Sequence, residues 1–293
     1  MNSIELIFSL RDEHNKIHAQ KTIIKPTINS AGEVDVSKLL IINDNTAVVR
    51  VLVAVELNSS DDIIALLLVN NLLERRIPHI NRALSMPYVP YGRFDAVPTT
   101  ANPFSLKVFA NMINSCNFDD VYIADPPNTV ASALINNVTV LETKDILNRI
   151  KNDASTDWDD VVLVSPDAAK TEKTYQIAQK CGFKEVIHTD KIRNIELGKI
   201  TKIEIYGDVE GKKCLIVDDV CDSGYRAFKL AGALREKGAK NIILYVTHGI
   251  FSEKLRILEN LVDSVYTTDS INQSQTLEEA KGLNLEFNVI DIK

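Results

Sequence analysis

The sequence lacks the signatures of several common classes of protein. It contains no run of about 18 apolar residues, so a membrane-spanning helix is not expected. The apolar part of residues 1–12 is too short for a secretion signal. Neither the G-x-G-x-x-G fingerprint of dinucleotide-binding folds nor the phosphate loop G-x-x-x-x-G-K-[ST] occurs. These absences argue against a membrane protein, and against the two nucleotide-binding motifs that are easiest to recognise.

Cysteine is rare, and positive charge is in deficit. The 33 lysines and arginines face 40 aspartates and glutamates, for a formal net charge of −7 with no basic stripe, so nucleic acid is not an expected partner. Cys214 lies in an apolar segment that suits a buried free thiol. The four cysteines show no zinc-ligand spacing. Together, these features of the cysteines predict a reducing, cytoplasmic location.

The chain is long enough for two domains, and its pattern is that of an α/β protein. Its 293 residues can form two separate cores. Short β-branched runs alternate with amphipathic helical stretches, which predicts mostly parallel sheets flanked by helices. A polar zone at 144–160 marks the approach to the second domain. We therefore predict one domain over 1–140 and another over 141–277.

Polar loops follow several of the predicted strands. Such loops come after Val89, at the end of a strand predicted over Ser85–Val89, and after Ala124, Val164 and Val217. In parallel α/β sheets, ligands bind beyond the carboxyl ends of the strands. We therefore expect the functional residues of each domain to lie at that edge of its sheet.

The most informative stretch is Lys213–Arg226, which reads K-C-L-I-V-D-D-V-C-D-S-G-Y-R. A buried strand over Cys214–Val217 is followed by the carboxylates of Asp218 and Asp219, a small-residue loop, and a helix over 225–237. The loop and the helix N-terminus can present backbone N–H groups to a phosphate. The two carboxylates can accept hydrogen bonds from sugar hydroxyls or hold a hydrated Mg²⁺. An acidic pair alone is more often a solvated feature of a strand-to-helix turn.

The whole stretch, however, resembles the phosphoribosyl-pyrophosphate (PRPP) motif of the type I phosphoribosyltransferases and PRPP synthetases. That motif has four apolar residues, Asp-Asp, two apolar residues and Asp-Thr-Gly-Gly-Thr. The chain matches it through Gly224, with Ser for the first Thr, and then departs from it. The resemblance implies that Asp218 and Asp219 hold the ribose, and that the phosphate is bound by Asp222, Ser223, Gly224, Tyr225 and Arg226.

Three further motifs follow the order of the PRPP synthetases. P-Y-V-P-Y-G-R-F-D resembles Pro-Tyr-x-x-Tyr-x-Arg-Gln-Asp, which implies that Arg93 and Asp95 bind ATP. S-P-D implies that Asp167 lies near the metal, and D-K-I-R implies that Lys191 and Arg193 belong to a flexible catalytic loop. The chain thus resembles a divergent member of the ribose-phosphate pyrophosphokinase family. The implied fold is two tandem type I phosphoribosyltransferase domains, with 278–293 returning to complete the first.

The sequence departs from the family at two other places. Pro127 stands where the family has a metal-binding His, two residues after Asp125, which we still expect near the metal. In the turn that contacts adenine, Asn29 and Ala31 replace Phe and Asp, and Glu33 alone is retained. In the family this turn reaches the site of a neighbouring subunit, which implies a homo-oligomer, a dimer or a hexamer.

The implied reaction transfers the β,γ-diphosphoryl group of ATP to the C1 hydroxyl of ribose 5-phosphate, with Mg²⁺ as cofactor, and yields PRPP and AMP. Tyr225 and Arg226 leave open a larger ribose 5-phosphate ester, such as ADP-ribose, as the acceptor. Pro127, Asn29 and Ala31 leave open a catalytically weak regulatory subunit. A phosphoribosyltransferase that joins PRPP to a base is disfavoured by the length of the chain and by the synthetase motif around Arg93.

Overall fold

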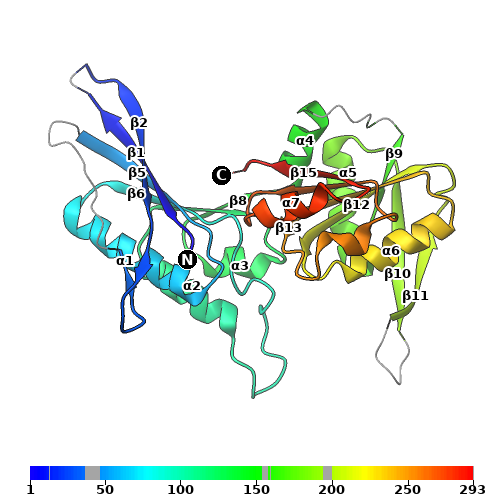
Figure 1. Cartoon of the computed structure of the whole chain (residues 1–293), viewed down its shortest axis with the longest axis horizontal. Helices are drawn as coiled ribbons and strands as arrows, with labels where there is room; N and C mark the ends of the chain where they lie inside the picture. Colours follow the sequence, from blue (N-terminus) through cyan, green and yellow to red (C-terminus); the bar gives the residue numbers. More distant parts are fainter. Residues whose placement is uncertain (13, 37–46, 154–157, 159, 194–199, 293) are drawn as a thin grey trace. The chain divides into compact units, whose positions relative to one another are not determined.

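The computed structural model describes residues 1–12, 14–36, 47–153, 158, 160–193 and 200–292 (Figure 1). Its backbone contacts divide the chain into two compact units, Met1–Leu141 and Glu142–Ile292. Each unit has a mostly parallel sheet with helices packed on it (Figure 1). The α/β fold class predicted from the sequence is therefore confirmed. In the described part of the chain, no helix has both the length and the hydropathy needed to cross a membrane.

The sheet of the first unit has the strand order β2-β1-β5-β6-β7-β8 within the described residues. β1 is antiparallel to both β2 and β5, and the remaining neighbours are parallel. A small hairpin, β3–β4, stands apart from this sheet. The elements are β1 (Ile4–Arg11), β2 (Ile17–Ile24), β3 (Thr27–Ile28), β4 (Val34–Asp35), β5 (Ala47–Ala54), α1 (Ser60–Arg76), β6 (Asn81–Ser85), α2 (Ser105–Asn114), β7 (Asp120–Ala124), α3 (Thr129–Leu134) and β8 (Val138–Leu141).

The first core forms between this sheet and its helices. Alternate residues of β1 are buried, including Leu6 and Phe8, as expected for a strand with one face on a core. α1 begins after Ser59, whose side chain accepts a hydrogen bond from the Asp62 N–H and so caps the helix. Its Leu66 and Leu73 are fully buried in the same cluster. This helix therefore has a capped, polar start and an apolar face in the core.

The sheet of the second unit has the order β11-β10-β9-β12-β13-β14-β15 among the described strands. Its neighbours are parallel, except that β10 and β11 form an antiparallel pair. The elements are α4 (Thr143–Asp153), β9 (Val161–Val164), η1 (Ala168–Lys170), α5 (Thr171–Cys181), β10 (Val186–Arg193), β11 (Ile200–Tyr206), β12 (Lys213–Cys221), α6 (Tyr225–Glu236), β13 (Asn241–Gly249), η2 (Leu255–Leu258), β14 (Ser264–Thr268), α7 (Ser274–Ala280) and β15 (Glu286–Ile290).

β12 is a central strand of this sheet, and almost its whole length is buried. Cys214 and Ile216 pack in one cluster with Leu230 and Leu234 of α6. Because successive strand residues point to opposite faces, the intervening Leu215 faces the other layer. The four cysteines, Cys214 among them, are free and buried, as expected for a chain without disulfides.

Two expectations from the sequence are wrong. The strand predicted over Ser85–Val89 lies earlier, at β6 (Asn81–Ser85), because Pro87 begins the loop that leaves the sheet. The segment 278–293 does not return to the first unit. Its strand β15 pairs in parallel with β14, and Phe287 packs edge-on against Phe251 at 5.8 Å between ring centroids. The pairing with β14 and this apolar contact place β15 in the second unit.

Candidate functional site

The acidic pair predicted at the end of a strand lies inside β12. Asp218 pairs with Val246 of β13, and the pairing continues to Cys221, opposite Gly249. The strand therefore ends four residues beyond the apolar run from which it was predicted. Both carboxylates are buried, and they point to opposite faces of the sheet because they are neighbours on a strand.

The turn after β12 has the geometry expected of a phosphate-binding loop. Gly224 has φ +76°, and a Cβ at this position would lie 3.0 Å from Cγ2 of Ile257, so both backbone and space favour glycine. The Ser252 hydroxyl donates to Asp222 Oδ1 at 2.8 Å, and the Ser252 N–H donates to the Asp222 carbonyl at 2.9 Å. α6 then begins with no side-chain cap at Gly224, and the Tyr225 N–H donates to the Ser223 hydroxyl at a long 3.4 Å.

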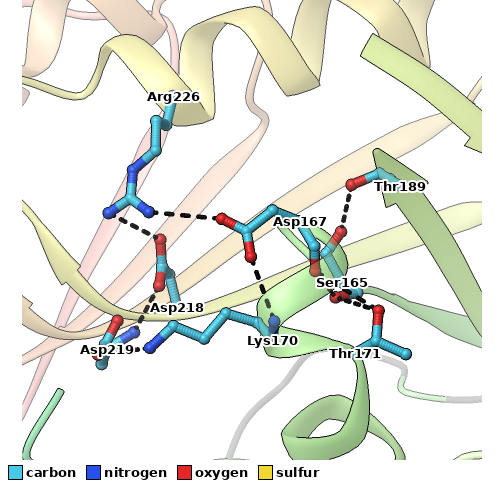
Figure 2. Close-up of polar contacts among 8 residues, drawn as sticks. All are labelled: Ser165, Asp167, Lys170, Thr171, Thr189, Asp218, Asp219 and Arg226. Carbon is cyan, nitrogen blue, oxygen red and sulfur yellow. Dashed lines mark hydrogen bonds and ion pairs between the residues drawn. The ribbon is translucent and has the colours of Figure 1, made fainter. Parts of the chain in front are cut away.

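The side chains of the two aspartates face different cations, as Figure 2 shows. Lys170 Nζ lies 2.7 Å from Asp219 Oδ2. On the other side, Arg226 Nη2 lies 3.5 Å from Asp218 Oδ2, and its Nη1 lies 3.8 Å from Asp167 Oδ2. The Asp219 N–H also donates to Asp218 Oδ1 at 3.0 Å. We call these five side chains, from Asp167, Lys170, Asp218, Asp219 and Arg226, the carboxylate cluster.

The two neighbouring aspartates differ in acidity. Burial raises the pKa of Asp218 to about 7, and the hydrogen bond with Asp219 and the charge of that residue act in the same direction. Burial also disfavours the ionised form of Asp219. The hydrogen bond with Asp218 and the Lys170 ammonium outweigh it, however, and hold the pKa of Asp219 below its usual range. Near neutral pH the pair therefore keeps Asp219 ionised, while Asp218 exchanges its proton.

The turn that carries Asp167 and Lys170 is braced by hydroxyl groups at the end of β9 (Figure 2). The Thr189 hydroxyl donates to the Ser165 carbonyl at 2.6 Å, and the Ser165 hydroxyl donates to the Asp167 carbonyl at 2.7 Å. Asp167 caps η1 by accepting the Lys170 N–H at 3.2 Å. These bonds fix the position from which Lys170 reaches Asp219.

Sequence reasoning missed Lys170. Its signal was available, because it lies three residues after Asp167 and at the start of a helical stretch. Its role depends on the 3₁₀ turn η1, which directly precedes α5 and which the sequence pattern does not distinguish from that helix. Sequence reasoning also missed three hydroxyl groups. Those of Ser165 and Thr171 form hydrogen bonds within this turn, and that of Thr189 reaches the turn from the neighbouring strand β10.

Tyr225, which the resemblance places among the phosphate-binding residues, contacts side chains of its own helix. Its ring stacks against Phe228 with centroids 6.2 Å apart, and Lys229 Nζ lies 5.4 Å from the centre of the Tyr225 ring. The ring is nonetheless half exposed. The structure thus brings Asp167, Asp218, Asp219 and Arg226 together, with Tyr225 at the beginning of the same helix.

Lys191 and Arg193, the predicted catalytic pair, lie in the strand β10 rather than in a loop. Lys191 is opposite Ile203 of β11, and Arg193 is opposite Ile200. This antiparallel pair extends beyond the parallel part of β10, where Ile187 pairs with Val164 of β9. The remainder of the predicted loop, residues 194–199, lies outside the described residues.

Two of the residues predicted to bind ATP, and one predicted to bind the metal, lie on two neighbouring loops of the first unit. Arg93 and Asp95 follow β6, and Asp125 follows β7. The Asn128 side-chain amide donates to the Gly92 carbonyl at 2.8 Å and joins the two loops. A Cβ on Gly92 would lie 3.4 Å from Cδ of Pro127. Pro127, at the position of the family histidine, therefore packs against the loop that carries Arg93.

Glu33, the third predicted ATP ligand, belongs to the turn between β3 and β4. The Asn29 amide donates to Glu33 Oε2 at 2.9 Å, and Asn29 Oδ1 accepts the N–H groups of Ala31 and Glu33. The Asn29 side chain therefore stabilises the turn by accepting hydrogen bonds from the backbone, as asparagine commonly does. The contacts described for Glu33 stay within this turn, and its side chain is exposed.

No preformed metal cage is found among the residues that the structure describes. They contain no group of three or more His, Cys, Asp or Glu side chains arranged to hold a metal ion. Asp125 belongs to the first unit, and Asp167 of the second already faces Arg226. Mg²⁺ commonly uses one or two protein carboxylates together with the phosphates of a substrate. Each of these aspartates fits that kind of site rather than a site made of protein ligands alone.

A strand, a small-residue loop and a helix N-terminus, beside a buried acidic pair, define an α/β protein of the phosphoribosyltransferase type. The family model described as "Phosphoribosyl synthetase-associated domain" matches residues 150–291. The ribose-phosphate pyrophosphokinase of Hyphomonas neptunium is 28% identical over 233 residues, which cover 78% of this chain and 73% of that protein. The enzyme of the same name from Chromobacterium violaceum is 33% identical over 196 residues, 64% of this chain and 57% of that protein.

A solved structure supports the same assignment at the level of the fold. The phosphoribosylpyrophosphate synthetase of Mycobacterium smegmatis matches with a TM-score of 0.73 and 20% identity, over 92% of this chain and 86% of that one. The chain belongs to the ribose-phosphate pyrophosphokinase family, of which it is a divergent member. The family predicted from four ordered motifs is therefore confirmed.

Proposed function

We propose that this protein is a ribose-phosphate diphosphokinase. It transfers the β,γ-diphosphoryl group of ATP to the C1 hydroxyl of ribose 5-phosphate and yields PRPP and AMP. The observation that carries the proposal is the buried pair Asp218 and Asp219, placed on β12 directly before the Gly224 turn and α6. Few functions other than binding a phosphorylated sugar need acceptors for hydroxyls so close to donors for a phosphate.

The acceptor binds to the second unit in this proposal. The N–H groups of the loop Asp222–Gly224 and of the first turn of α6 bind the 5-phosphate, helped by the helix dipole. Asp219, ionised and held by Lys170, accepts hydrogen bonds from the ribose hydroxyls. Asp218 lies beside it and, with a pKa of about 7, can take up or release a proton at neutral pH.

The donor in this proposal is ATP, and its ligands are taken from the family likeness. Arg93, Asp95 and Glu33 bind ATP, and Lys191 and Arg193 neutralise the charge on the transferred group. Asp125 and Asp167 are the carboxylates proposed to hold Mg²⁺, each with phosphate oxygens of the substrate as further ligands. When bound, the metal ion supplies charge neutralisation on the diphosphoryl group. The family likeness also supports a homo-oligomer, a dimer or a hexamer, in which the turn of Glu33 serves a neighbouring subunit.

A direct product assay tests this function. Purified protein, ATP and Mg²⁺ are incubated with ribose 5-phosphate or with ADP-ribose, and AMP release and the mass of the product are recorded. We expect AMP and a gain of one diphosphoryl group on ribose 5-phosphate. The same gain on ADP-ribose alone would change the acceptor. No AMP with either acceptor would contradict the proposal and favour a regulatory subunit.

A matched pair of variants links the activity to the site. Asp219→Asn removes a charged acceptor of sugar hydroxyls and is expected to lower kcat/KM by roughly 100-fold. Asp160→Asn changes an exposed carboxylate of the same unit, at a positive φ that asparagine adopts readily, and should leave kcat/KM unchanged. Equal activity in the two variants would exclude the assigned role of Asp219.

A further inference from the structure

The carboxylate cluster carries its own positive charges. Asp167, Asp218 and Asp219 supply up to three negative charges, and Lys170 and Arg226 supply two positive ones within 4 Å of them. The buried aspartates can therefore be present without a metal ion, because burying carboxylates is costly only when they lack compensation.

The two cations of the cluster are held differently. Lys170 Nζ is 2.7 Å from Asp219 Oδ2, and these side chains are only 21% and 4% exposed. Arg226 stands 3.5 Å from Asp218 and 3.8 Å from Asp167, longer than hydrogen bonds to a carboxylate, and its side chain is 47% exposed. Lys170 is a fixed partner, whereas Arg226 is held by charge and can leave toward solvent at little cost.

Arg226 spans the carboxylates of Asp167 and Asp218. Figure 2 shows its guanidinium turned toward Asp167 on one side and Asp218 on the other. The guanidinium therefore supplies the positive charge between two carboxylates. These come from different segments, the turn after β9 and the strand β12. A divalent cation that binds to both oxygens must first displace it.

We propose that Arg226 is an exchangeable counter-cation that occupies the carboxylates of Asp167 and Asp218 and competes with divalent metal ions for them. That the metal binds together with a nucleotide phosphate rests on the proposed function. The competition between Arg226 and the metal ion does not. Divalent cations alone bind weakly to the protein for this reason, and removal of the guanidinium strengthens their binding.

The test is a titration of the full-length protein with Mn²⁺, without nucleotide or sugar, followed by the electron paramagnetic resonance of free Mn²⁺. Arg226→Gln keeps a side chain of similar length but removes the charge. We expect it to bind Mn²⁺ roughly tenfold more tightly than the unaltered protein, because a positive charge a few ångströms from the metal is lost. Arg226→Lys keeps the charge and should bind Mn²⁺ nearly as weakly as the unaltered protein.

Two controls localise the effect. Lys229→Gln removes a positive charge from the same helix, at a residue that lies over the rings of Tyr225 and Phe228 rather than in the cluster, and should leave Mn²⁺ affinity unchanged. The double variant R226Q/D167N should lose the gain. Circular dichroism and thermal unfolding establish that each variant is folded, which is expected because Arg226 is half exposed.

An Arg226→Gln variant that binds Mn²⁺ no more tightly than Lys229→Gln overturns the proposal. A gain that persists in R226Q/D167N also overturns it, because the metal would then bind elsewhere. The titration needs no turnover, so it is independent of the product assay. Loss of the enzymatic proposal would leave the Mn²⁺ result unaffected, and the converse also holds.

Discussion

At the scale of single residues, the site depends on the pleat of one strand. Asp218 and Asp219 are adjacent in β12, and the strand directs them to opposite faces, where each meets a different cation. Asp219 has a close ammonium and stays ionised. Asp218 has a looser guanidinium partner, and its burial raises its pKa to about 7. One Asp-Asp dipeptide thus provides a permanent anion and a group that can exchange a proton.

The raised pKa predicts how Asp218 contributes to stability at different pH values. The folded protein prefers the protonated form of Asp218, whose pKa is about 7, compared with about 3.9 when the chain is unfolded. The stabilisation by this proton is therefore complete below about pH 4 and is lost as the pH rises toward 7. Over that interval, Asp218 lowers the free energy of unfolding by an amount on the order of a few kcal/mol.

Asp218→Asn should remove this part of the pH dependence. We expect the free energy of unfolding, measured in urea at pH 5 and pH 8, to fall less between the two values in the variant than in the unaltered protein. Asp219 does not interfere, because its lowered pKa keeps it ionised in the folded state at both values. Parallel pH profiles for the two proteins would show that Asp218 has an ordinary pKa.

At the scale of elements, the sequence predicted the compact pieces of the second unit well. The end of β9 at Val164 was placed correctly, because a serine and a proline follow the apolar run. β12 was made too short, because an apolar run ends at Asp218, whereas the hydrogen bonds to β13 continue to Cys221. Lys170 was missed because its contact with Asp219 joins residues 49 positions apart. Motifs show which residues carry the chemistry, but partners across the sheet are set by packing.

The turn between β12 and α6 allows a direct test of local backbone requirements. Gly224→Ala places a Cβ 3.0 Å from Ile257 and forces alanine to φ +76°, so we expect a loss of about 1–2 kcal/mol in the free energy of unfolding. Gly232→Ala is the matched control. Gly232 lies within α6, and a Cβ there meets no atom within 4 Å, so that variant should gain up to about 1 kcal/mol.

Chemical denaturation of both alanine variants measures these differences. A stable Gly224→Ala protein would mean that the turn adopts another conformation. The loop after β12 would then lose the backbone geometry on which phosphate binding depends.

At the scale of the whole chain, both units have a mostly parallel sheet with helices packed on it. The sequence prediction assigned the C-terminal strand to the wrong one of these two units. The final strand has a pattern, E-F-N-V-I-D-I, that suits the edge of either sheet. Sequence periodicity carries no information about which edge is open. In the structure, β15 continues the parallel order after β14, and its Phe287 packs against the core of the second unit.

This assignment predicts where a destabilising substitution will be felt. Phe287→Ala removes a partly buried ring that contacts Phe251, and we expect it to cost about 1–3 kcal/mol, less than for a fully buried phenylalanine. Hydrogen exchange, followed by mass spectrometry, should show lost protection in β14 and β15 and unchanged protection in β1–β8, because the two units have separate cores. Phe94→Ala, at an exposed ring of the first unit, is the control and should change neither. Lost protection in the first unit after Phe287→Ala would instead mean that the C-terminal strand completes the first domain, as the family resemblance had implied.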